Sequence, residues 1–214
     1  MGASMSFFDG LTADQERALR TLMHRRRFER GEVVFHEGDP GASLHIIESG
    51  WFLVHTVTGA GERVGMTIEG PNEMFGEMSM LAAGGKRTAT VRALRPSETM
   101  SLDIEHFERL REEVSWVDRF LIGLLVRRVE RLSRQLAETA WLPAEKRVCR
   151  QLHRLVQAFD PEPIYLKQSE IAQLAQTTRP TVSSVLGELS KNSIVRTGRG
   201  SVEVLDREGL EGRI

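Results

Sequence analysis

The hydrophobic pattern of this chain changes its period once, close to residue 104. Between residues 31 and 104, short apolar runs alternate with turn residues such as Gly38-Asp39 and Gly70-Pro71. Short strands at this regular spacing are typical of a β-barrel or jelly roll. Between residues 114 and 139 there is no proline, and apolar residues recur at spacings of three and four, which indicates one long helix. We therefore expect an α+β chain in which a β jelly roll precedes a long helix.

The bulk composition excludes several other kinds of protein. With 214 residues the chain is long enough for two small domains, and its formal net charge of −1 argues against a generally basic nucleic-acid binder. The single cysteine, Cys149, excludes an intramolecular disulfide and a four-cysteine metal site. No apolar run reaches membrane-spanning length and no signal peptide is visible. We expect a cytoplasmic protein without a membrane partner.

The N-terminal region predicts a short helix followed by a basic segment. Thr12 and Gln15 have the spacing of a capping box, at the start of a helix that reaches about Met23. Four basic residues, His24-Arg25-Arg26-Arg27, come next. We interpret them as the solvated end of this helix rather than as a phosphate-binding patch.

The long helix carries two occupied faces. Leu121, Leu124 and Arg128 lie on one face and are expected to pack on the jelly roll. The other face has a straight seam of apolar residues at coiled-coil spacing, flanked by charged residues, and this seam predicts a dimer interface. A single helix buried in its own domain is the alternative. The seam consists of Ile122, Leu125, Val129, Leu132 and Leu136.

A proline marks the end of the long helix and a change of domain. Pro143 cannot continue the helical hydrogen bonds and biases Leu142 away from the helical conformation. A further helix with a strong apolar face follows from Ala144, and Cys149 lies beside that face as a small core residue. We expect a jelly-roll domain over residues 1–113, a dimerisation helix and hinge over 114–142, and a second domain over 143–214.

Residues 75–90 contain the groups that a cyclic phosphodiester on a ribose requires. Gly76 lets the backbone approach a ligand closely, and Glu77 can accept a hydrogen bond from a ribose hydroxyl. Arg87 presents a planar fork that matches phosphate oxygens, and Thr88 adds a hydroxyl beside it. Met78 completes the expected contacts in this segment. The segment resembles the phosphate-binding cassette of cyclic-nucleotide-binding domains.

Residues 168–187 have the pattern of a helix-turn-helix, in which small and apolar residues recur at fixed offsets. Thr178 is placed to cap the second helix, and Pro180 lies in its first turn, where no donor is lost. A hairpin follows at about 194–205 and would form a wing. A three-helix scaffold with an exposed polar helix is the alternative. The expected DNA contacts are Ser169, Thr178, Arg179, Thr181, Ser183, Ser184, Lys191 and Arg199.

The order of jelly roll, long helix and winged helix-turn-helix, with Gly-Glu and Arg-Thr-Ala in the first part, resembles the Crp/Fnr family of bacterial transcription regulators over nearly the whole chain. The resemblance implies a homodimer that binds a cyclic nucleotide in each barrel and a pseudo-palindromic operator through two recognition helices. It also implies roles in ligand contact for Arg128 and for the pair Leu132 and Ser133 on the long helix. In the family that pair commonly carries two hydroxyls, so the base stays open between cyclic AMP and cyclic GMP.

We expect a DNA-binding transcription regulator, a homodimer under allosteric control of a cyclic nucleotide, with RNA polymerase as a further partner. One alternative is a regulator of the same type that is constitutive or senses a different ligand. A second is a cyclic-nucleotide-binding regulatory subunit of a kinase or channel. The six histidines show no ligand spacing, and no nucleophile–base pair is apparent. We therefore expect neither an enzyme nor a metal site, and no cofactor beyond the effector.

Overall fold

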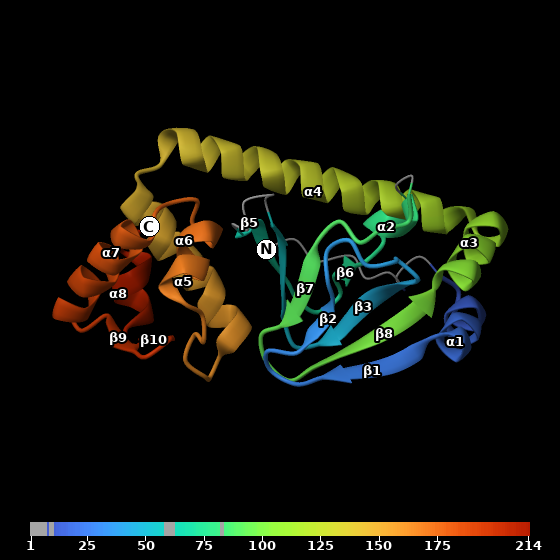
Figure 1. The fold of residues 1–214 in the computed structure, drawn as a ribbon, viewed down its shortest axis with the longest axis horizontal. Helices are drawn as coiled ribbons and strands as arrows, with labels where there is room; N and C mark the ends of the chain where they lie inside the picture. The colour runs from blue at the N-terminus through green and yellow to red at the C-terminus, as the bar shows by residue number, and fades with distance from the viewer. Residues whose placement is uncertain (1–7, 9–10, 58–62, 82–83) are drawn as a thin grey trace. The chain divides into compact units, whose positions relative to one another are not determined.

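The computed structural model describes residues 8, 11–57, 63–81 and 84–214 (Figure 1). The chain divides into two units, one formed by residues 1–62 and 67–129 and the other by residues 63–66 and 130–214. The long helix α4 (Ser115–Trp141) contributes its first part to one unit and its last part to the other. Its 27 residues span about 40 Å at 1.5 Å per residue.

The first unit is built around two four-stranded sheets, as expected of a jelly roll. One sheet has the strand order β1-β8-β3-β6 and the other the order β2-β7-β4-β5. The pairs β1–β8, β3–β8, β3–β6, β2–β7 and β4–β7 are all antiparallel. The strands are β1 (His24–Phe28), β2 (Val33–Phe35), β3 (Ser43–Ser49), β4 (Phe52–Val57), β5 (Arg63–Glu69), β6 (Met74–Phe75), β7 (Thr90–Ala93) and β8 (Ser97–Asp103).

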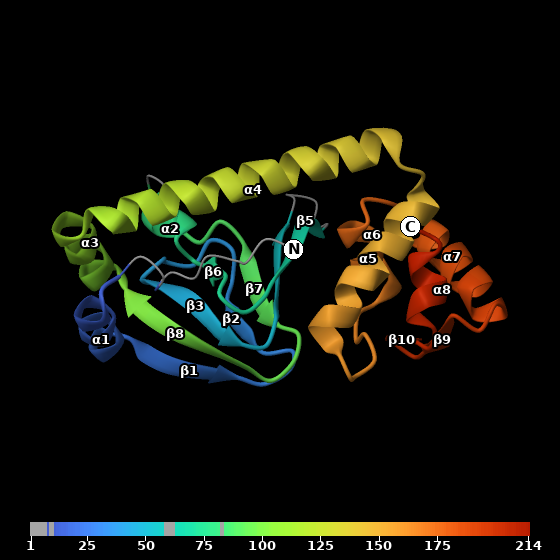
Figure 2. The same cartoon turned by 180° about the vertical axis from the view of Figure 1, so that it is seen from behind.

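Three helices pack against this unit, and a fourth short helix interrupts it. Helix α1 (Ala13–Leu22) begins at the predicted capping box of Thr12 and Gln15. Helices α3 (Ile104–Glu113) and α4 follow β8, while the four-residue α2 (Met78–Leu81) follows β6. Figures 1 and 2 show the first part of α4 lying along the strands of the first unit. The core under these helices contains Leu19, Leu44, Leu102, Phe107, Val117, Phe120, Leu121 and Leu124.

The basic residues at 24–27 form a strand, so their interpretation as the end of a helix is wrong. Strand β1 pairs with β8 at the edge of its sheet, in the register Arg26↔Thr99. Arg27 Nε donates to the Glu98 carboxylate at 2.8 Å, and Arg25 pairs with the same carboxylate at 3.4 Å. The four consecutive basic residues gave no sign of this cross-strand pairing, because Glu98 lies some seventy positions further along the chain. Charged side chains also protect an exposed sheet edge from pairing with other chains.

The two faces of α4 differ sharply in exposure, as the sequence predicts. Leu121 and Leu124 are buried against the first unit. The residues of the seam are exposed in the single chain, from 38% for Leu125 to 70% for Leu136. Exposed apolar side chains in a continuous row are unusual for an isolated helix, and such a row marks a surface for another helix or protein.

The second unit contains the predicted winged helix-turn-helix. Helix α5 (Ala144–Phe159) provides a buried apolar face, which includes Cys149. Helices α6 (Gln168–Leu174) and α7 (Arg179–Lys191) form the helix-turn-helix, and β9 (Val195–Gly198) pairs with β10 (Ser201–Val204) as the wing. The short α8 (Arg207–Glu211) closes the chain. The arrangement agrees with the prediction of a jelly roll, a long helix and a winged helix-turn-helix.

Gly76 connects β6 to α2, and no other residue fits there without a shift of its neighbours. Its φ of +91° lies in a region that L side chains rarely adopt. A Cβ at this position would lie 2.8 Å from Nη1 of Arg87 and 2.9 Å from the carbonyl oxygen of Ser43. The missing side chain of Gly76 therefore makes room for the Arg87 guanidinium.

We predict that Gly76→Ala destabilises the protein more than Gly84→Ala. Gly84 also has a positive φ, of +109°, but a Cβ there would meet nothing within 4 Å. The control should therefore cost only backbone strain of about 1–2 kcal/mol. Gly76→Ala should cost about 1–3 kcal/mol more through crowding of Arg87. Chemical denaturation of both variants measures the difference, and equal losses of unfolding free energy would contradict the role given to the close contact.

Candidate functional site

Arg87 occupies the centre of a polar cluster inside the first unit. It is only 6% exposed, and its Nη1 donates to the carbonyl oxygens of Ser43 at 2.6 Å and Gly76 at 3.2 Å. Nη1 also contacts the Ser79 hydroxyl, and Nη2 the Ser43 hydroxyl, each at 3.2 Å. The ring of Phe35 lies 4.0 Å from the guanidinium carbon. These contacts hold the plane of the guanidinium in a fixed orientation.

Glu77 is fully buried and forms an ion pair with Arg128 of α4. Arg128 also donates from Nη2 to the carbonyl oxygen of Met74 at 3.1 Å, so its side chain is fixed at two points. Burial raises the pKa of the Glu77 carboxyl above its ordinary value, and the positive charge of Arg128 opposes that shift. The pair joins the segment after β6 to the face of α4 that packs on the first unit.

Two buried polar atoms in this cluster lack a hydrogen-bond partner among the described residues. They are Nε of Arg87 and Oε2 of Glu77, whose other carboxylate oxygen contacts Arg128. Burial without a hydrogen bond is costly, and native structures rarely leave such groups unsatisfied. Arg87 offers a donor, while Glu77 offers acceptors beside the ion pair. The cluster suits a ligand with an anionic oxygen for Arg87 and a hydroxyl for Glu77.

Aromatic rings and a neutral histidine form the inner side of the cluster. His45 stacks on Phe75 with 5.0 Å between ring centroids, and its Nδ1 lies 3.0 Å from the Thr99 hydroxyl. Burial, together with the charges of Arg87 and Arg26, lowers the pKa of His45 to about 3. His45 is therefore neutral at physiological pH and adds no positive charge to that of Arg87.

Ser43, Ser79, His45 and Phe35 are parts of the cluster that sequence reasoning missed. Ser43 and Arg87 are separated by 44 positions, and no motif links them. One weak signal was available for Ser79, because it follows the Gly-Glu pair by two positions and lies in a segment already assigned to the ligand. A Cβ on Gly41 would lie 2.2 Å from the Ser79 hydroxyl, so the loop before β3 also approaches this helix closely.

The other expected ligand contacts do not enter the polar cluster. Thr88 follows Arg87 but is exposed, and Met78 is 36% exposed at the start of α2. Leu132 and Ser133 lie on α4, about one turn beyond Arg128, and both are exposed. Gly76, Glu77, Arg87 and Arg128 are the predicted residues that the structure brings together.

Apart from Thr181, which is half-buried, the expected DNA contacts are exposed on the helix-turn-helix and wing. The hydroxyl of Thr178 accepts from the backbone N–H of Thr181 at 3.4 Å, which makes it the N-cap of α7 as predicted. Arg179 is exposed in the first turn of α7, whereas Val182 and Val185 are buried beneath it. The remaining exposed candidates are Ser169, Ser183, Ser184, Lys191 and Arg199, the last in the turn of the wing.

The described residues were also compared with the requirements of a metal site and of a membrane-spanning helix. No group of three or more histidine, cysteine, aspartate or glutamate side chains is arranged to hold a metal ion in the described part of the chain. Among the helices of that same part, none is both long and apolar enough to cross a membrane.

Comparison with protein families divides the chain in two. A family model described as a cyclic nucleotide-binding domain matches residues 25–114. A second model, described as a Crp-like helix-turn-helix domain, matches residues 146–213. The first match contains the Arg87 cluster, and the second contains α6, α7 and the wing.

Individual relatives match nearly the whole length of the chain. The cyclic AMP receptor protein of Thermus thermophilus is 33% identical over 205 residues, which are 95% of this chain and 94% of the relative. A CRP-like cAMP-activated global transcriptional regulator of Mycobacterium tuberculosis is 30% identical, with 99% and 97% of the two chains covered. A crystal structure of the Thermus thermophilus catabolite activator protein is 32% identical, covers 96% of each chain and superposes with a TM-score of 0.54.

The relatives are transcription regulators, and both domain matches coincide with the fold and the residue clusters described above. The chain belongs to the Crp/Fnr family of transcription regulators, and it is a DNA-binding regulator that carries a cyclic-nucleotide-binding domain.

Proposed function

We propose that a cyclic nucleotide binds at the Arg87 cluster and controls DNA binding by the second unit. The observation that carries this proposal is the pair of buried atoms without hydrogen bonds, Nε of Arg87 and Oε2 of Glu77. A cyclic phosphodiester supplies an anionic acceptor for Arg87, and the adjacent ribose hydroxyl supplies a donor for Glu77. No catalytic role is assigned to any of these residues.

The remaining ligand contacts follow the same geometry. Gly76 allows the close approach of Arg87, and Thr88 and Met78 line the exposed side of the segment. Arg128 pairs with the Glu77 carboxylate and opposes the burial that raises its pKa, and a carboxylate at this place can accept the ribose hydroxyl. Leu132 and Ser133 are proposed to meet the base. Both relatives above carry cyclic AMP in their names, which favours cyclic AMP over cyclic GMP as the effector.

We predict that Arg87→Ala lowers the affinity for cyclic AMP by a factor of about 100 or more. Removal of a buried charge-assisted contact leaves the phosphate unpaired in a desolvated site. The matched control is Lys86→Ala, which removes the exposed charge next to Arg87 in sequence and should bind the nucleotide as the unmodified protein does. Calorimetric titrations with cyclic AMP and cyclic GMP measure both variants. Unchanged binding by Arg87→Ala would exclude this cluster as the effector site.

If the unmodified protein binds neither nucleotide, the alternative of a constitutive regulator, or of a regulator with a different ligand, is favoured. The buried and orientated Arg87 argues against that alternative. The alternative of a regulatory subunit for a kinase or channel is disfavoured because the second unit is a helix-turn-helix domain.

We also propose that two copies of the chain associate through α4. The seam leaves five apolar side chains exposed in a single chain, and their spacing suits a parallel helix pair. The seam consists of Ile122, Leu125, Val129, Leu132 and Leu136. In such a dimer the first unit would lie on one face of α4 and the second copy on another. The boundaries at 113/114 and 142/143 then separate the effector domain, the dimer helix and the DNA-binding domain.

We predict that Leu136→Glu converts the dimer to a monomer at micromolar concentration. The substitution places a charge at the most exposed position of the seam, where two copies would meet. Ala137→Glu introduces the same charge one position away, on an exposed part of α4 outside the seam, and should leave the dimer intact. Sedimentation velocity distinguishes the two states, and a dimer that persists in Leu136→Glu would place the interface elsewhere.

For the second unit we propose that α7 is the recognition helix of a double-stranded DNA operator. Its N-cap, Thr178, and the exposed Arg179 lie at the end of the helix that enters the major groove in this motif. Ser183, Ser184, Lys191 and Arg199 would contact bases or phosphates beside it. In a dimer, two copies of α7 would read half-sites about 34 Å apart. We propose that this regulator acts in the cytoplasm and that RNA polymerase is a further partner.

We predict that Arg179→Ala weakens operator binding by about 10-fold or more, because a bidentate contact with guanine contributes about 1–3 kcal/mol of discrimination. The matched control is Arg213→Ala, which removes an exposed arginine that pairs with Glu188 at 3.3 Å. The operator is first selected from a random DNA pool with the unmodified protein, and the two variants are then compared by fluorescence anisotropy. Equal losses in both variants would indicate a general effect of charge, and an unaffected Arg179→Ala would move the reading contact elsewhere.

A further inference from the structure

The turn between α6 and α7 contains a residue in a strained backbone conformation. Gln176 has a φ of +49°, in the left-handed region where glycine is favoured. A glutamine at this position costs stability that a glycine would not, unless its side chain makes a contact of its own. Gln176 is also exposed, so its side chain is not required for the core.

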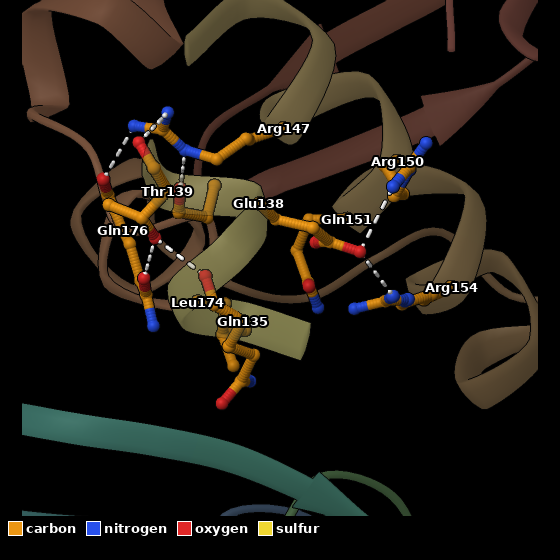
Figure 3. Close-up of a pocket in the computed structure, with 10 residues that line it drawn as sticks. Gln135, Glu138, Thr139, Arg147, Arg150, Gln151, Arg154, Leu174 and Gln176 are labelled. Atoms are coloured by element: carbon orange, nitrogen blue, oxygen red, sulfur yellow. Dashed lines mark hydrogen bonds and ion pairs between the residues drawn. The ribbon is translucent and has the colours of Figure 1, made fainter. Parts of the chain in front are cut away.

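The Gln176 side chain reaches the last turns of α4. Its amide contacts the hydroxyl of Thr139, as Figure 3 shows. The same hydroxyl lies 2.8 Å from the carbonyl oxygen of Gln135, one turn earlier on α4. A hydroxyl has one proton and can donate to one acceptor at a time. The structure turns Oε1 of Gln176 toward this hydroxyl, so the hydroxyl can donate either to Gln176 or to the carbonyl oxygen of Gln135.

Arg147 makes a second connection between the same two segments. From α5 its Nε donates to the carbonyl oxygen of Ala175 at 3.1 Å, and Nη2 donates to that of Gln176 at 2.9 Å. Nη1 donates to the carbonyl oxygen of Leu142, just after α4, at 2.6 Å. One guanidinium thus satisfies free carbonyl groups at the C-terminal ends of both α4 and α6. Its positive charge also suits the negative ends of these helices.

A carboxylate on α4 strengthens the connection to α5. Glu138 accepts from Nη1 of Arg150 at 3.0 Å and from Nη2 of Arg154 at 3.4 Å. In Figure 3 the Glu138 carboxylate faces Arg150 and Arg154. Thr139 and Gln176 lie on the opposite side of the last turn of α4. The last turn of α4 is therefore fixed to α5 by Glu138 and to the α6–α7 turn by Thr139 and Arg147.

We propose that Thr139 and Gln176 are positioning residues that set the orientation of α7 relative to the end of α4. Only two residues separate Gln176 from the first residue of α7, Arg179. A displacement of the last turn of α4 would be passed to the start of α7 through the amide contact. The glutamine at 176 thus couples the effector to the DNA-reading helix, and this inference rests on the function proposed above.

The test compares Thr139→Val with Thr139→Ser, and both with Gln176→Gly. Valine keeps the branched shape without the hydroxyl, serine keeps the hydroxyl, and glycine keeps the positive φ without the amide. The first measurement is amide hydrogen exchange over residues 175–181 without any ligand. Exchange should rise by about 2-fold to 10-fold in Thr139→Val and stay unchanged in Thr139→Ser, as expected for loss of one hydrogen bond. In Gln176→Gly the relief of backbone strain opposes that loss, so the rise should be smaller than in Thr139→Val.

The second measurement is the factor by which cyclic AMP changes operator affinity. This factor should fall by about 2-fold to 10-fold in Thr139→Val and in Gln176→Gly, while calorimetry shows that nucleotide still binds. The double variant should show no further loss, because both substitutions remove the same contact. Thr139→Ser should behave as the unmodified protein.

The outcomes separate this inference from the proposed function. If cyclic AMP has no effect on the unmodified protein, the proposed control by effector fails, and hydrogen exchange alone decides the inference. If exchange over residues 175–181 is the same in all three variants, Thr139 and Gln176 do not position α7. An additive double variant, or an unchanged factor beside an intact response in the unmodified protein, would also overturn the inference.

Discussion

Burial of the Arg87 guanidinium is the constraint on which the first unit depends. A charge removed from water is stable only if acceptors surround it, and here they come from the start of β3, the turn at Gly76 and the short helix α2. Gly76 must lack a side chain for this arrangement, and Ser79 must follow it closely. The strand order of the two sheets brings these distant segments to one place.

The second constraint is that α4 must serve several neighbours at once. Leu121 and Leu124 fill the core of the first unit, and Arg128 reaches the buried Glu77 from the same face. The opposite row of apolar residues stays exposed in a single chain. In the proposed dimer, a helix fixed to the Arg87 cluster on one side and exposing a seam on another would pass changes at the cluster to the second copy.

The sequence predicted the elements better than the contacts among them. The period change near residue 104, the capping box at Thr12 and the cap at Thr178 depend on neighbours within four positions, and the structure confirms them. The strand at 24–27 was missed because its stability comes from Glu98 on a partner strand. Ser43 was missed for the same reason, since its carbonyl meets Arg87 through the pairing of distant strands. Helix caps and hydrophobic periodicity can be predicted from neighbouring residues, whereas contacts between distant segments depend on the strand topology.

The contacts of Gln176 explain why an unfavourable backbone conformation is kept in the turn between α6 and α7. A positive φ favours glycine, so by its backbone alone Gln176 would destabilise this turn. In the structure the same residue joins Thr139 on α4, and its carbonyl accepts from Arg147. The strain at Gln176 and the contact with Thr139 have opposite effects on stability, so the turn is held in place without being strongly stabilised. A joint with that balance can change orientation for a modest free energy, and a regulator that must alternate between two states requires such a joint.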